Sequence, residues 1–495
     1  MRTDDAQKLQ ATLSQNQEPQ QKLSREACQG LWKRPIRGSA GANQKIHQQA
    51  QALEMEMLVY DAENLIPLGL PGSCMTSGQL IEKLAQENPE FKLKIDEPTG
   101  VVIGATAQNG TNYSIEPGGQ VEYASAPHIK TANLIQDVQN GLTRLTRAAQ
   151  GKVLFASHGT NPLGLVDMPL LVPKSRYLML SRYFGSQPGG RGLHMSRHTC
   201  TVQPNLDVFG DEAWAEAVAL TFLITPFVRH IFSNSRYFQG KNAQYQSERQ
   251  AIWEKTDSNR SGIPKGVPFA DDIPCAYLKW AMQAGVMFIS QLSIEEQPLF
   301  GELKFEQWLN DGYKGTKPSL QDWETHLGTL FPDLRLRGFL EIRMVDAQPF
   351  EHTLAPISFW VGLLQSATAR KRLREFMVGV TRTYFNCMGQ NISREQVPSA
   401  WELLLAEDAQ HQLFRDHYIH NQLINIAIEG LGEKKDELGI NALMAYKNFL
   451  SQKETYWQAN SARDFIAKIG TKNPEQMFVQ NIYNQNANEF GSNRP

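Results

Sequence analysis

Glutamates alternate with large apolar residues in the segment L-E-M-E-M-L-V, in which Glu54 and Glu56 stand two positions apart. Residues two apart on a β-strand point to the same face, so a strand here would carry both carboxylates on one face and leucine and methionine side chains on the other. Burying ionised carboxylates is costly unless cations neutralise them. The segment therefore predicts a sheet with one packed face and one face that meets cations or water.

Three further segments combine an apolar face with an oxygen-bearing face. They are the hairpin N-Y-S-I-E-P-G-G-Q-V-E-Y, with Glu116 before its Pro-Gly-Gly turn and Glu122 after it, the segment T-V-Q-P-N-L-D, with Gln203, Asn205 and Asp207 on one face, and the segment G-F-L-E-I-R, with Glu341 and Arg343 on one face.

The chemistry of these side chains points to phosphate and metal. Oxygen-rich sites select hard cations, and Mg²⁺ characteristically joins carboxylates to substrate phosphates. The planar fork of an arginine suits a transferring phosphoryl group because it can donate two hydrogen bonds. Any one of these pairs alone is typical of the solvated face of an antiparallel sheet. The four segments together favour a metal site, but they do not name a reaction.

Periodicity along the chain predicts an α+β architecture. Alternating patterns predict strands at 53–60, 113–124, 199–208 and 338–344. Helical patterns appear at 76–86, 129–149, 211–233, 274–287, 358–380, 400–430 and 438–468. Strands scattered among long helices, with an early hairpin, favour an α+β domain over a regular βαβ repeat. Residues 1–45 form a polar lead-in, and the tail after 473 is predicted to be loose.

Bulk properties exclude several classes of partner. A net charge of −2 gives no general attraction for nucleic acid or anionic membranes. The longest apolar stretches reach about a dozen residues, whereas a membrane span needs about 20. Five dispersed cysteines without a C-x-x-C pair argue against a disulfide framework and suit a reducing compartment. Because the N-terminus also lacks a secretory signal, we expect a soluble, cytoplasmic protein that binds small molecules.

Five ordered segments resemble signature segments of the glutamate–cysteine ligases of the plant and proteobacterial type. They are S-I-E-P-G-G-Q-V-E-Y-A-S-A-P at 114–127, T-C-T-V-Q-P-N-L-D at 199–207, S-E-R-Q-A-I-W-E-K-T-D-S-N-R-S-G at 247–262, H-L-G-T-L-F-P-D-L-R-L-R-G-F-L-E-I-R at 326–343 and F-W-V-G-L-L at 359–364. P-K-S-R-Y at 173–177 also fits. The similarity runs in order over residues 52–365 and continues loosely into the helical end.

This resemblance implies a glutamine-synthetase-like catalytic domain over 46–400, a curved antiparallel sheet flanked by helices, with a helical part over 401–495 packed on the same domain. It also implies a reaction in which ATP phosphorylates the γ-carboxylate of glutamate and the amine of cysteine displaces phosphate. The product would be γ-glutamylcysteine, a precursor of glutathione or a related thiol. Two alternatives stay open: a ligase for a different amine, and a non-catalytic regulatory relative. The protein would be a monomer or homodimer.

Matching the motifs residue by residue implies a metal set and a nucleotide set. The Mg²⁺ ligands would be Glu54, Glu56, Glu116, Glu122 and Glu341, with Gln203 as a neutral ligand. Arg343 would contact the transferring phosphoryl group beside Glu341, and Asn205 would join Arg343 at the ATP.

The same matching implies a set of substrate-binding residues. Arg249 would bind a carboxylate of glutamate, and Trp253 would wall the glutamate pocket. Arg176 and Arg260 are further candidates for binding anions.

The chain departs from the family pattern at several positions. Met344 and Val345 stand where the family has a small pair, and His198 stands where an arginine is usual. Pro204 replaces a valine, which suits an edge strand or a bulge. Glu248 adds a charge beside Arg249. These changes leave the identity of the amine acceptor open.

Three other features have ordinary interpretations. The G-G-R-G segment at 189–192 lacks the pattern of a phosphate-binding loop and is predicted to be a flexible loop near the active site. Cys200 falls on the apolar side of its predicted strand, so a packing role is expected. His411, His417 and His420 are expected on a helix surface or in packing rather than around a metal.

Overall fold

The structure is a computed structural model that describes residues 49–337, 339–393, 395–407 and 411–483. The predicted lead-in at 1–45 lies outside the described residues. At the centre is a nine-stranded sheet in which every pairing is antiparallel. Its strands are β1 (Gln51–Asp61), β2 (Lys92–Asp96), β3 (Val101–Thr106), β4 (Asn112–Ile115), β5 (Val121–Ala124), β6 (Val153–Ala156), β7 (Val202–Leu206), β12 (Leu334–Leu336) and β13 (Leu340–Ile342). The strand order is β12-β13-β7-β1-β5-β4-β3-β2, with β6 paired to the second half of β1.

The central strand β1 has the two faces that its sequence predicts. Leu53, Met55 and Met57 are fully buried, whereas Glu54 and Glu56 are partly exposed. The apolar side chains belong to the main hydrophobic core, which fixes the register of the strand, since a slip by one residue would bury both carboxylates.

The predicted hairpin joins β4 to β5. The amide of Gly119 donates to the carbonyl of Glu116 at 2.9 Å, and the amide of Glu116 donates to the carbonyl of Gln120 at 2.9 Å. Gly119 has a φ of +83°, a left-handed conformation that glycine adopts without a steric cost. The turn therefore ends β4 at the position that projects Glu116 from the end of the strand.

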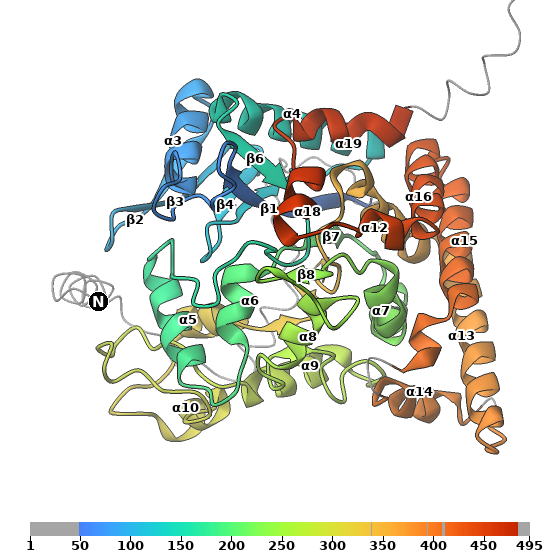
Figure 1. Ribbon diagram of the computed structural model, residues 1–495. Helices are drawn as coiled ribbons and strands as arrows, with labels where there is room; N and C mark the ends of the chain where they lie inside the picture. The colour runs from blue at the N-terminus through green and yellow to red at the C-terminus, as the bar shows by residue number, and fades with distance from the viewer. Residues whose placement is uncertain (1–48, 338, 394, 408–410, 484–495) are drawn as a thin grey trace, which may run out of the picture.

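Helices α3 (Ser77–Glu87), α4 (Thr131–Ala149) and α19 (Pro474–Tyr483) form a layer on one side of the sheet, at the top of Figure 1. In α4 the buried side chains Leu134, Val138, Leu142 and Leu145 recur at helical spacing and enter the same core as the apolar face of β1. This layer covers the apolar face, so the carboxylate face of β1 points away from it.

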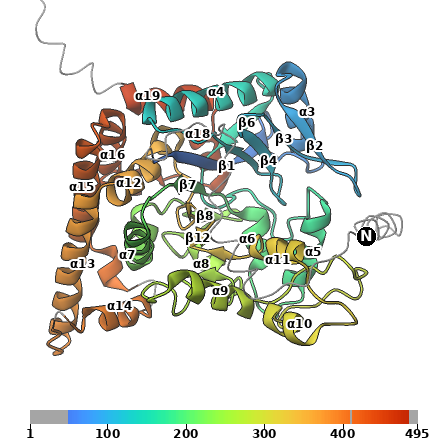
Figure 2. The ribbon, with the colours of Figure 1, turned by 180° about the vertical axis from the view of Figure 1, so that it is seen from behind.

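Shorter elements lie on the opposite side of the sheet (Figures 1 and 2). They are α5 (Ser175–Gly185), α6 (Gly192–His198), α8 (Glu248–Glu254), α9 (Ile273–Gln283), α10 (Phe305–Asp311), α11 (Leu320–Leu327) and the two-stranded pairs β8 (Tyr237–Phe238) with β9 (Lys241–Asn242) and β10 (Ser261–Gly262) with β11 (Phe331–Pro332). The long helix α7 (Asp211–Ile231) is mostly apolar and mostly buried from Ala217 to Val228, whereas Arg229 and His230 near its end are partly exposed.

The C-terminal part is helical, as predicted. Its helices are α12 (Leu354–Leu364), α13 (Ala367–Cys387), α14 (Val397–Leu405), α15 (His417–Glu433), α16 (Glu437–Leu450), α17 (Lys453–Tyr456) and α18 (Ala462–Ile469), with the 3-10 turns η1 (Phe350–His352) and η2 (Gln412–Arg415). The α+β class with an antiparallel sheet and helical C-terminal part is thus confirmed. The division of the chain at residue 400 stays a prediction, and α14 runs across that position.

Several local predictions about the helices were wrong. The helix expected at 400–430 is divided into α14, η2 and α15, and the helix expected at 438–468 is divided into α16, α17 and α18. The single helix expected at 358–380 is two helices, because the side chain of Ser366 accepts from the amide of Ala369 and starts α13 anew. The tail expected to be loose after 473 instead forms α19 over residues 474–483. Phe478 and Ile482 of that helix are buried, and their apolar spacing of four residues was hidden in a polar composition.

Pro204 lies inside the sheet and not at an edge or bulge as predicted. It sits on β7, between β1 and β13, in regular register with Leu53. The amide and carbonyl of Leu53 are bonded to Ser125 on the other side, so Pro204 and Leu53 form a pair without hydrogen bonds. The pairing of β7 with β13 covers only Asn205 and Leu206. The missing amide hydrogen of the proline therefore costs no ladder bond.

None of the helices in the described part of the chain is long and apolar enough to cross a membrane. This agrees with the short apolar stretches seen in the sequence.

Candidate active site

Strand register gathers the predicted carboxylates on the polar face of the sheet. Glu56 on β1 lies opposite Glu122 on β5, and Glu54 on β1 lies opposite Gln203 on β7. Opposite residues of an antiparallel pair point to the same face with Cβ atoms about 5 Å apart. These side chains therefore form two neighbouring cross-strand pairs in the middle of the sheet, and their carboxylates form a carboxylate row on its polar face.

The remaining predicted oxygen ligands extend this group at both ends. On β13, Glu341 lies opposite Asn205 of β7, whose side-chain amide donates to Glu54 at 3.0 Å. At the other end, the hairpin turn carries Glu116, whose carboxylate accepts from the hydroxyl of Tyr177 at 3.4 Å. The predicted metal set from four distant segments thus shares one face of one sheet.

The pKa values of three of these carboxylates are raised by burial and by neighbouring negative charges together. Burial raises the pKa of Glu54 to about 8, with further increases from the negative charges of Glu341 and Glu122. Burial and the charge of Glu116 raise the pKa of Glu122 to about 7. Burial, together with Glu116 and Glu122, raises the pKa of Glu56 well above its ordinary value. The protein alone therefore supplies too little positive charge for this face.

Glu341 is the exception in the group. Its side chain is 1% exposed and accepts from Arg335 at 2.7 Å and from Arg343 at 2.7 Å, while Arg337 lies at 3.2 Å. Although burial acts to raise its pKa, these guanidinium groups hold the pKa of Glu341 well below the ordinary range. Glu341 is therefore ionised at neutral pH.

Sequence reasoning missed Arg335 and Arg337. The available signal was the alternation in L-R-L-R at 334–337, which places both arginines on the face that β13 continues with Glu341. Arg335 lies opposite Glu341 in the register of β12 and β13. The cationic end of the site is therefore larger than the single Arg343 that was predicted.

Arg343 lies between the carboxylates of the sheet face and a small pocket that it helps to line. Its guanidinium donates to the side-chain oxygen of Gln203 at 2.6 Å and to Glu341 at 2.7 Å. Its Nε is buried and has no hydrogen-bond partner. A guanidinium with an unused donor beside a row of carboxylates can bind an incoming anionic oxygen.

The donor set fits divalent cations of the Mg²⁺ type by its chemistry. The ligands are oxygens, and four of the five carboxylates have raised pKa values that an added cation would lower. Within the described residues, no three acidic, histidine or cysteine side chains converge closely enough to hold a metal ion. Mg²⁺ commonly binds one or two carboxylates with water and substrate phosphate, so such a cage is not required.

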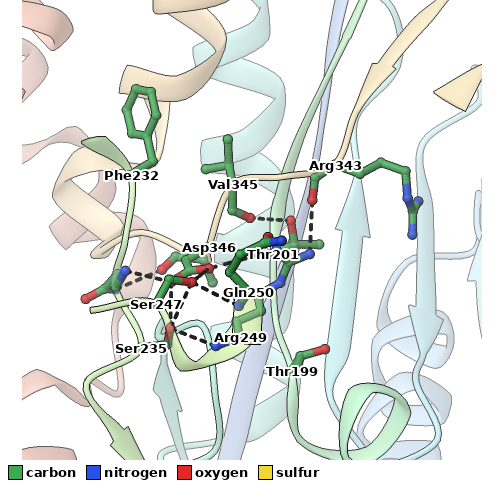
Figure 3. Close-up of polar contacts among 12 residues, drawn as sticks. Thr199, Thr201, Phe232, Ser235, Ser247, Arg249, Gln250, Arg343, Val345 and Asp346 are labelled. Carbon is green, nitrogen blue, oxygen red and sulfur yellow. Dashed lines mark hydrogen bonds and ion pairs between the residues drawn. The ribbon is translucent and has the colours of Figure 1, made fainter. Parts of the chain in front are cut away.

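Arg249 lies on α8 below this face and is 2% exposed. Its terminal nitrogen donates to the backbone carbonyl of Arg343 at 3.0 Å, and its other terminal nitrogen lies 3.8 Å from Asp346 (Figure 3). Its Nε has no partner. Arg249 and Arg343, which are 94 residues apart in sequence, are thus brought together as predicted residues of one site.

A small pocket separates the two arginines from the strand pair β10–β11. It is lined by Arg249, Gln250, Trp253, Gly262, Phe331, Pro332, Asp333 and Arg343. Trp253 stacks edge-on against Phe331, with ring centroids 5.6 Å apart, and lies under the guanidinium of Arg249. The pocket combines two cations with an aromatic wall, and its volume of about 10 Å³ is room for one water-sized group.

The other two predicted anion-binding arginines lie elsewhere. Arg176 is exposed, donates to the carbonyl of Gly328 and lines a separate, largely apolar pocket between α5 and α11. Arg260 is fully buried, and all five of its N–H groups are bonded, to Asp257, the backbone and side chain of Thr329, Tyr183 and Gly285. No donor of Arg260 is free in this structure, and its substrate-binding role stays a prediction.

The departures from the family pattern fall around the same region. Glu248, beside Arg249, forms an ion pair of 2.8 Å with Arg191, so the G-R-G end of the 189–192 segment is tied to α8. His198 is buried, and burial lowers its pKa to about 3, so it does not replace the usual arginine as a cation. Cys200 is fully buried among apolar side chains, which confirms its packing role.

The packing role predicted for the histidines is confirmed for His420. His420 is buried and its ring bonds the carbonyl of Phe414 at 2.7 Å. No acidic, histidine or cysteine group suited to a metal is present around it in the part of the chain that the structure describes.

Comparison with known proteins shows which protein family the sequence matches. The family model described as glutamate-cysteine ligase family 2 matches residues 53–380. That interval contains every metal-ligand and arginine candidate discussed above, from Glu54 to Arg343.

Individual relatives match over a shorter span. A chloroplastic glutamate–cysteine ligase of Solanum lycopersicum is 32% identical over 265 residues, covering 52% of this chain and 49% of its own length. Ligase B of Oryza sativa subsp. japonica is 32% identical over 297 residues, covering 57% and 55%, and the Arabidopsis thaliana enzyme is 30% identical over 273 residues, covering 52% and 49%. The chain spans about half the length of the curated relatives it matches.

These relatives contradict the expected location of the protein. All three are named as chloroplastic, so the prediction of a cytoplasmic protein, which rested on isolated cysteines and the N-terminal composition, was wrong.

Among solved structures, a glutamate–cysteine ligase from Francisella tularensis in complex with AMP aligns with a TM-score of 0.45 and 13% identity, covering 88% of this chain and 89% of its own. Because the family model covers the carboxylate strands, the arginine segments and α12 in one continuous match, the chain belongs to glutamate-cysteine ligase family 2.

Proposed function

We propose that this protein is an ATP-dependent ligase that joins the γ-carboxylate of glutamate to the amine of cysteine and forms γ-glutamylcysteine. The single observation that carries the proposal is the shared sheet face on which Glu54, Glu56, Glu122 and Glu341 meet Arg343. A carboxylate is a poor electrophile, whereas its acyl phosphate is a good one. An enzyme that makes an acyl phosphate must hold two anions, ATP and a carboxylate, next to each other.

Bound Mg²⁺ would neutralise the nucleotide phosphates and offset the charge that develops during phosphoryl transfer. The residues proposed to hold it are those whose charge the protein leaves unbalanced, together with the neutral oxygen of Gln203 and the ionised Glu341. They are Glu54, Glu56, Glu116, Glu122, Gln203 and Glu341. Asn205 is proposed to lie at the nucleotide, where its amide already orients Glu54.

Arg343 and Arg249 are proposed to bind different anions, the transferring phosphoryl group and a carboxylate of glutamate. Arg343 has an unused Nε and lies beside Glu341, so it is proposed to contact the phosphoryl group during transfer. Arg249 is proposed to bind a carboxylate of glutamate in the pocket walled by Trp253 and Phe331. Arg176, which is exposed near Glu116, is proposed as a peripheral contact for an anionic substrate.

The residues that follow Arg343 bear on the identity of the acceptor amine. Met344 and Val345, which replace the small pair of the family, are buried directly after Arg343. This observation supports a second candidate function, a related ligase that couples glutamate to an amine other than cysteine. The active species is proposed to be a monomer or a homodimer.

The proposal is tested with the purified protein, glutamate, ATP, Mg²⁺ and a panel of amines that includes cysteine. We expect phosphate release that depends on both glutamate and cysteine, with a product of the mass of γ-glutamylcysteine. Phosphate release without a preference for cysteine would favour the second candidate. No phosphate release with any amine would leave the third candidate, a regulatory relative without turnover.

A further inference from the structure

Asp346 is a buried carboxylate that lies beside Arg249 and does not line the pocket. It is 1% exposed and accepts three hydrogen bonds, from the amide of Asn234 at 2.8 Å and from the hydroxyls of Ser235 at 2.7 Å and Ser247 at 3.0 Å. Figure 3 shows Asp346 at the centre of these contacts. A buried carboxylate with this many donors is held in one orientation.

Both terminal nitrogens of the Arg249 side chain contact residues of the segment 343–346. One terminal nitrogen lies 3.8 Å from Asp346, and the other donates to the carbonyl of Arg343. The backbone amide of Arg249 donates to the hydroxyl of Ser235, which itself donates to Asp346. Asp346 thus reaches Arg249 twice, once through its guanidinium and once through the start of α8.

The N-terminus of α8 depends on the same carboxylate. Ser247 caps the helix by accepting from the amide of Gln250 at 3.0 Å, and the hydroxyl of Ser247 donates to Asp346. The cap is therefore oriented by Asp346, and the cap fixes the direction in which Arg249, two residues later, leaves the helix.

The support for Asp346 comes from two distant parts of the chain. Trp457, at the end of α17, donates to the side chain of Asn234 at 3.1 Å. On the other side, the hydroxyl of Thr201 donates to the carbonyl of Val345 at 2.6 Å, and the amide of Thr201 donates to Glu56 at 3.0 Å. Asp346 therefore stands between a C-terminal helix and the strand that holds a proposed metal ligand.

Close packing leaves the carboxylate little freedom. A Cβ atom added at Gly159 would lie 2.8 Å from the Cβ and the carboxyl carbon of Asp346. The glycine at this position allows the backbone of 159 to approach the carboxylate. The site is therefore built around an aspartate in one position.

We propose that Asp346 is a positioning residue that orients Arg249 for the carboxylate of the acidic substrate without touching that substrate. The inference rests on the proposed function, because it assigns the purpose of Arg249 within that site. It adds a residue to which no motif match assigned a role. It also implies that Trp457, at the end of α17, helps to hold the site through Asn234.

An arginine that must face a carboxylate in a fixed direction loses affinity when it can rotate. The loss of one well-oriented hydrogen bond to a charged group weakens binding about 10- to 100-fold. For Asp346→Asn, which keeps the shape and removes the charge, we expect the KM for glutamate to rise about 10- to 100-fold. We expect the KM for ATP to stay within about twofold and kcat to fall less than the KM rises, because Asp346 has no described contact with the carboxylate row or Arg343's guanidinium.

The decisive experiment is a double-mutant cycle of Asp346→Asn and Arg249→Lys, read by the KM for glutamate and by calorimetric binding of glutamate. If Asp346 acts through Arg249, the double variant should be little worse than Arg249→Lys alone. Fully additive effects, or an unchanged KM in Asp346→Asn, would overturn the proposal. Wild-type protein that neither binds nor consumes glutamate would instead overturn the proposed function.

A matched control separates positioning from general stability. Asp137 on α4 also accepts three hydrogen bonds, from Tyr123, His128 and the amide of Ala126, but it lies on the other side of the sheet. Asp137→Asn should lower the Tm and leave the KM for glutamate unchanged. If Asp346→Asn does not fold, Ser247→Ala removes one donor to the carboxylate and should raise the KM severalfold, and an unchanged KM there would also count against the proposal.

Discussion

Replacing Glu54 by glutamine should stabilise the ligand-free protein at pH 8 while it removes the ligase activity. Burial, Glu341 and Glu122 raise the pKa of Glu54 to about 8. Glutamine has nearly the same shape, retains an oxygen that can accept from Asn205, and carries no charge. The substitution therefore removes a negative charge that lowers the free energy of unfolding of the ligand-free protein.

The sign of the effect follows from proton linkage. Because the pKa of Glu54 is higher in the folded protein than in the unfolded chain, the folded state binds more protons between about pH 4.5 and pH 8. Stability is therefore greatest below that interval and falls as the pH rises through it. Each pH unit contributes about 1.4 kcal/mol, so the whole interval sets an upper bound of about 5 kcal/mol.

The expected gain is smaller than this bound. Glu54 is partly exposed and shares its repulsion with Glu122, so we expect Glu54→Gln to raise the free energy of unfolding by about 1–3 kcal/mol at pH 8. The gain should shrink toward zero near pH 5, where the wild-type carboxyl is protonated in the folded protein.

The assay is thermal unfolding at pH 5, 6.5 and 8 in the presence of a chelator, and again after addition of Mg²⁺. The control is Glu87→Gln, which removes the same charge from an exposed position on α3. Mg²⁺ should raise the Tm of the wild type more at pH 8 than at pH 5, and should raise that of Glu54→Gln less. A gain no larger than that of Glu87→Gln, or a gain that does not change with pH, would refute the reasoning.

Three further substitutions test other parts of the site. Glu341→Gln should abolish phosphate release and, unlike Glu54→Gln, lower the free energy of unfolding by about 3–5 kcal/mol, since it leaves the buried guanidinium of Arg335 without its counter-charge; a rise in Tm would contradict this. Arg343→Lys should lower kcat more than it raises the KM for glutamate in steady-state assays, because its contact strengthens in the transition state, and the opposite pattern would make Arg343 a ground-state binding residue. Arg260→Lys should lower the Tm, because a lysine cannot replace five bonded donors, and leave the KM for glutamate unchanged; a raised KM would place Arg260 in the substrate site.

Much of the candidate site could be predicted from local sequence because strand periodicity is a local property. The alternation around Glu54 and Glu56, and the Pro-Gly-Gly turn between Glu116 and Glu122, depend on residues within a few positions of each other.

Features that the local sequence could not predict depend on partners distant in the chain. Arg260 is as basic as Arg249 in the sequence, and only the positions of Thr329 and Gly285 show that its donors are all used. Pro204 is tolerated in an interior strand because its side facing β1 makes no ladder bond and the pairing of β7 with β13 covers only Asn205 and Leu206. No local pattern contains either fact.

The sequence by itself determined which residues share a face of each strand, where the hairpin turns, and, through its motifs, the family to which the chain belongs. Only the tertiary structure decided which strands lie side by side, and with them the raised pKa values of Glu54 and Glu122 and the placement of Asp346 beside Arg249. The physical reason is range. Side-chain alternation is set by the geometry of neighbouring residues, whereas Coulomb interactions, burial and hydrogen-bond saturation depend on atoms that the chain brings together from 100 or more residues away.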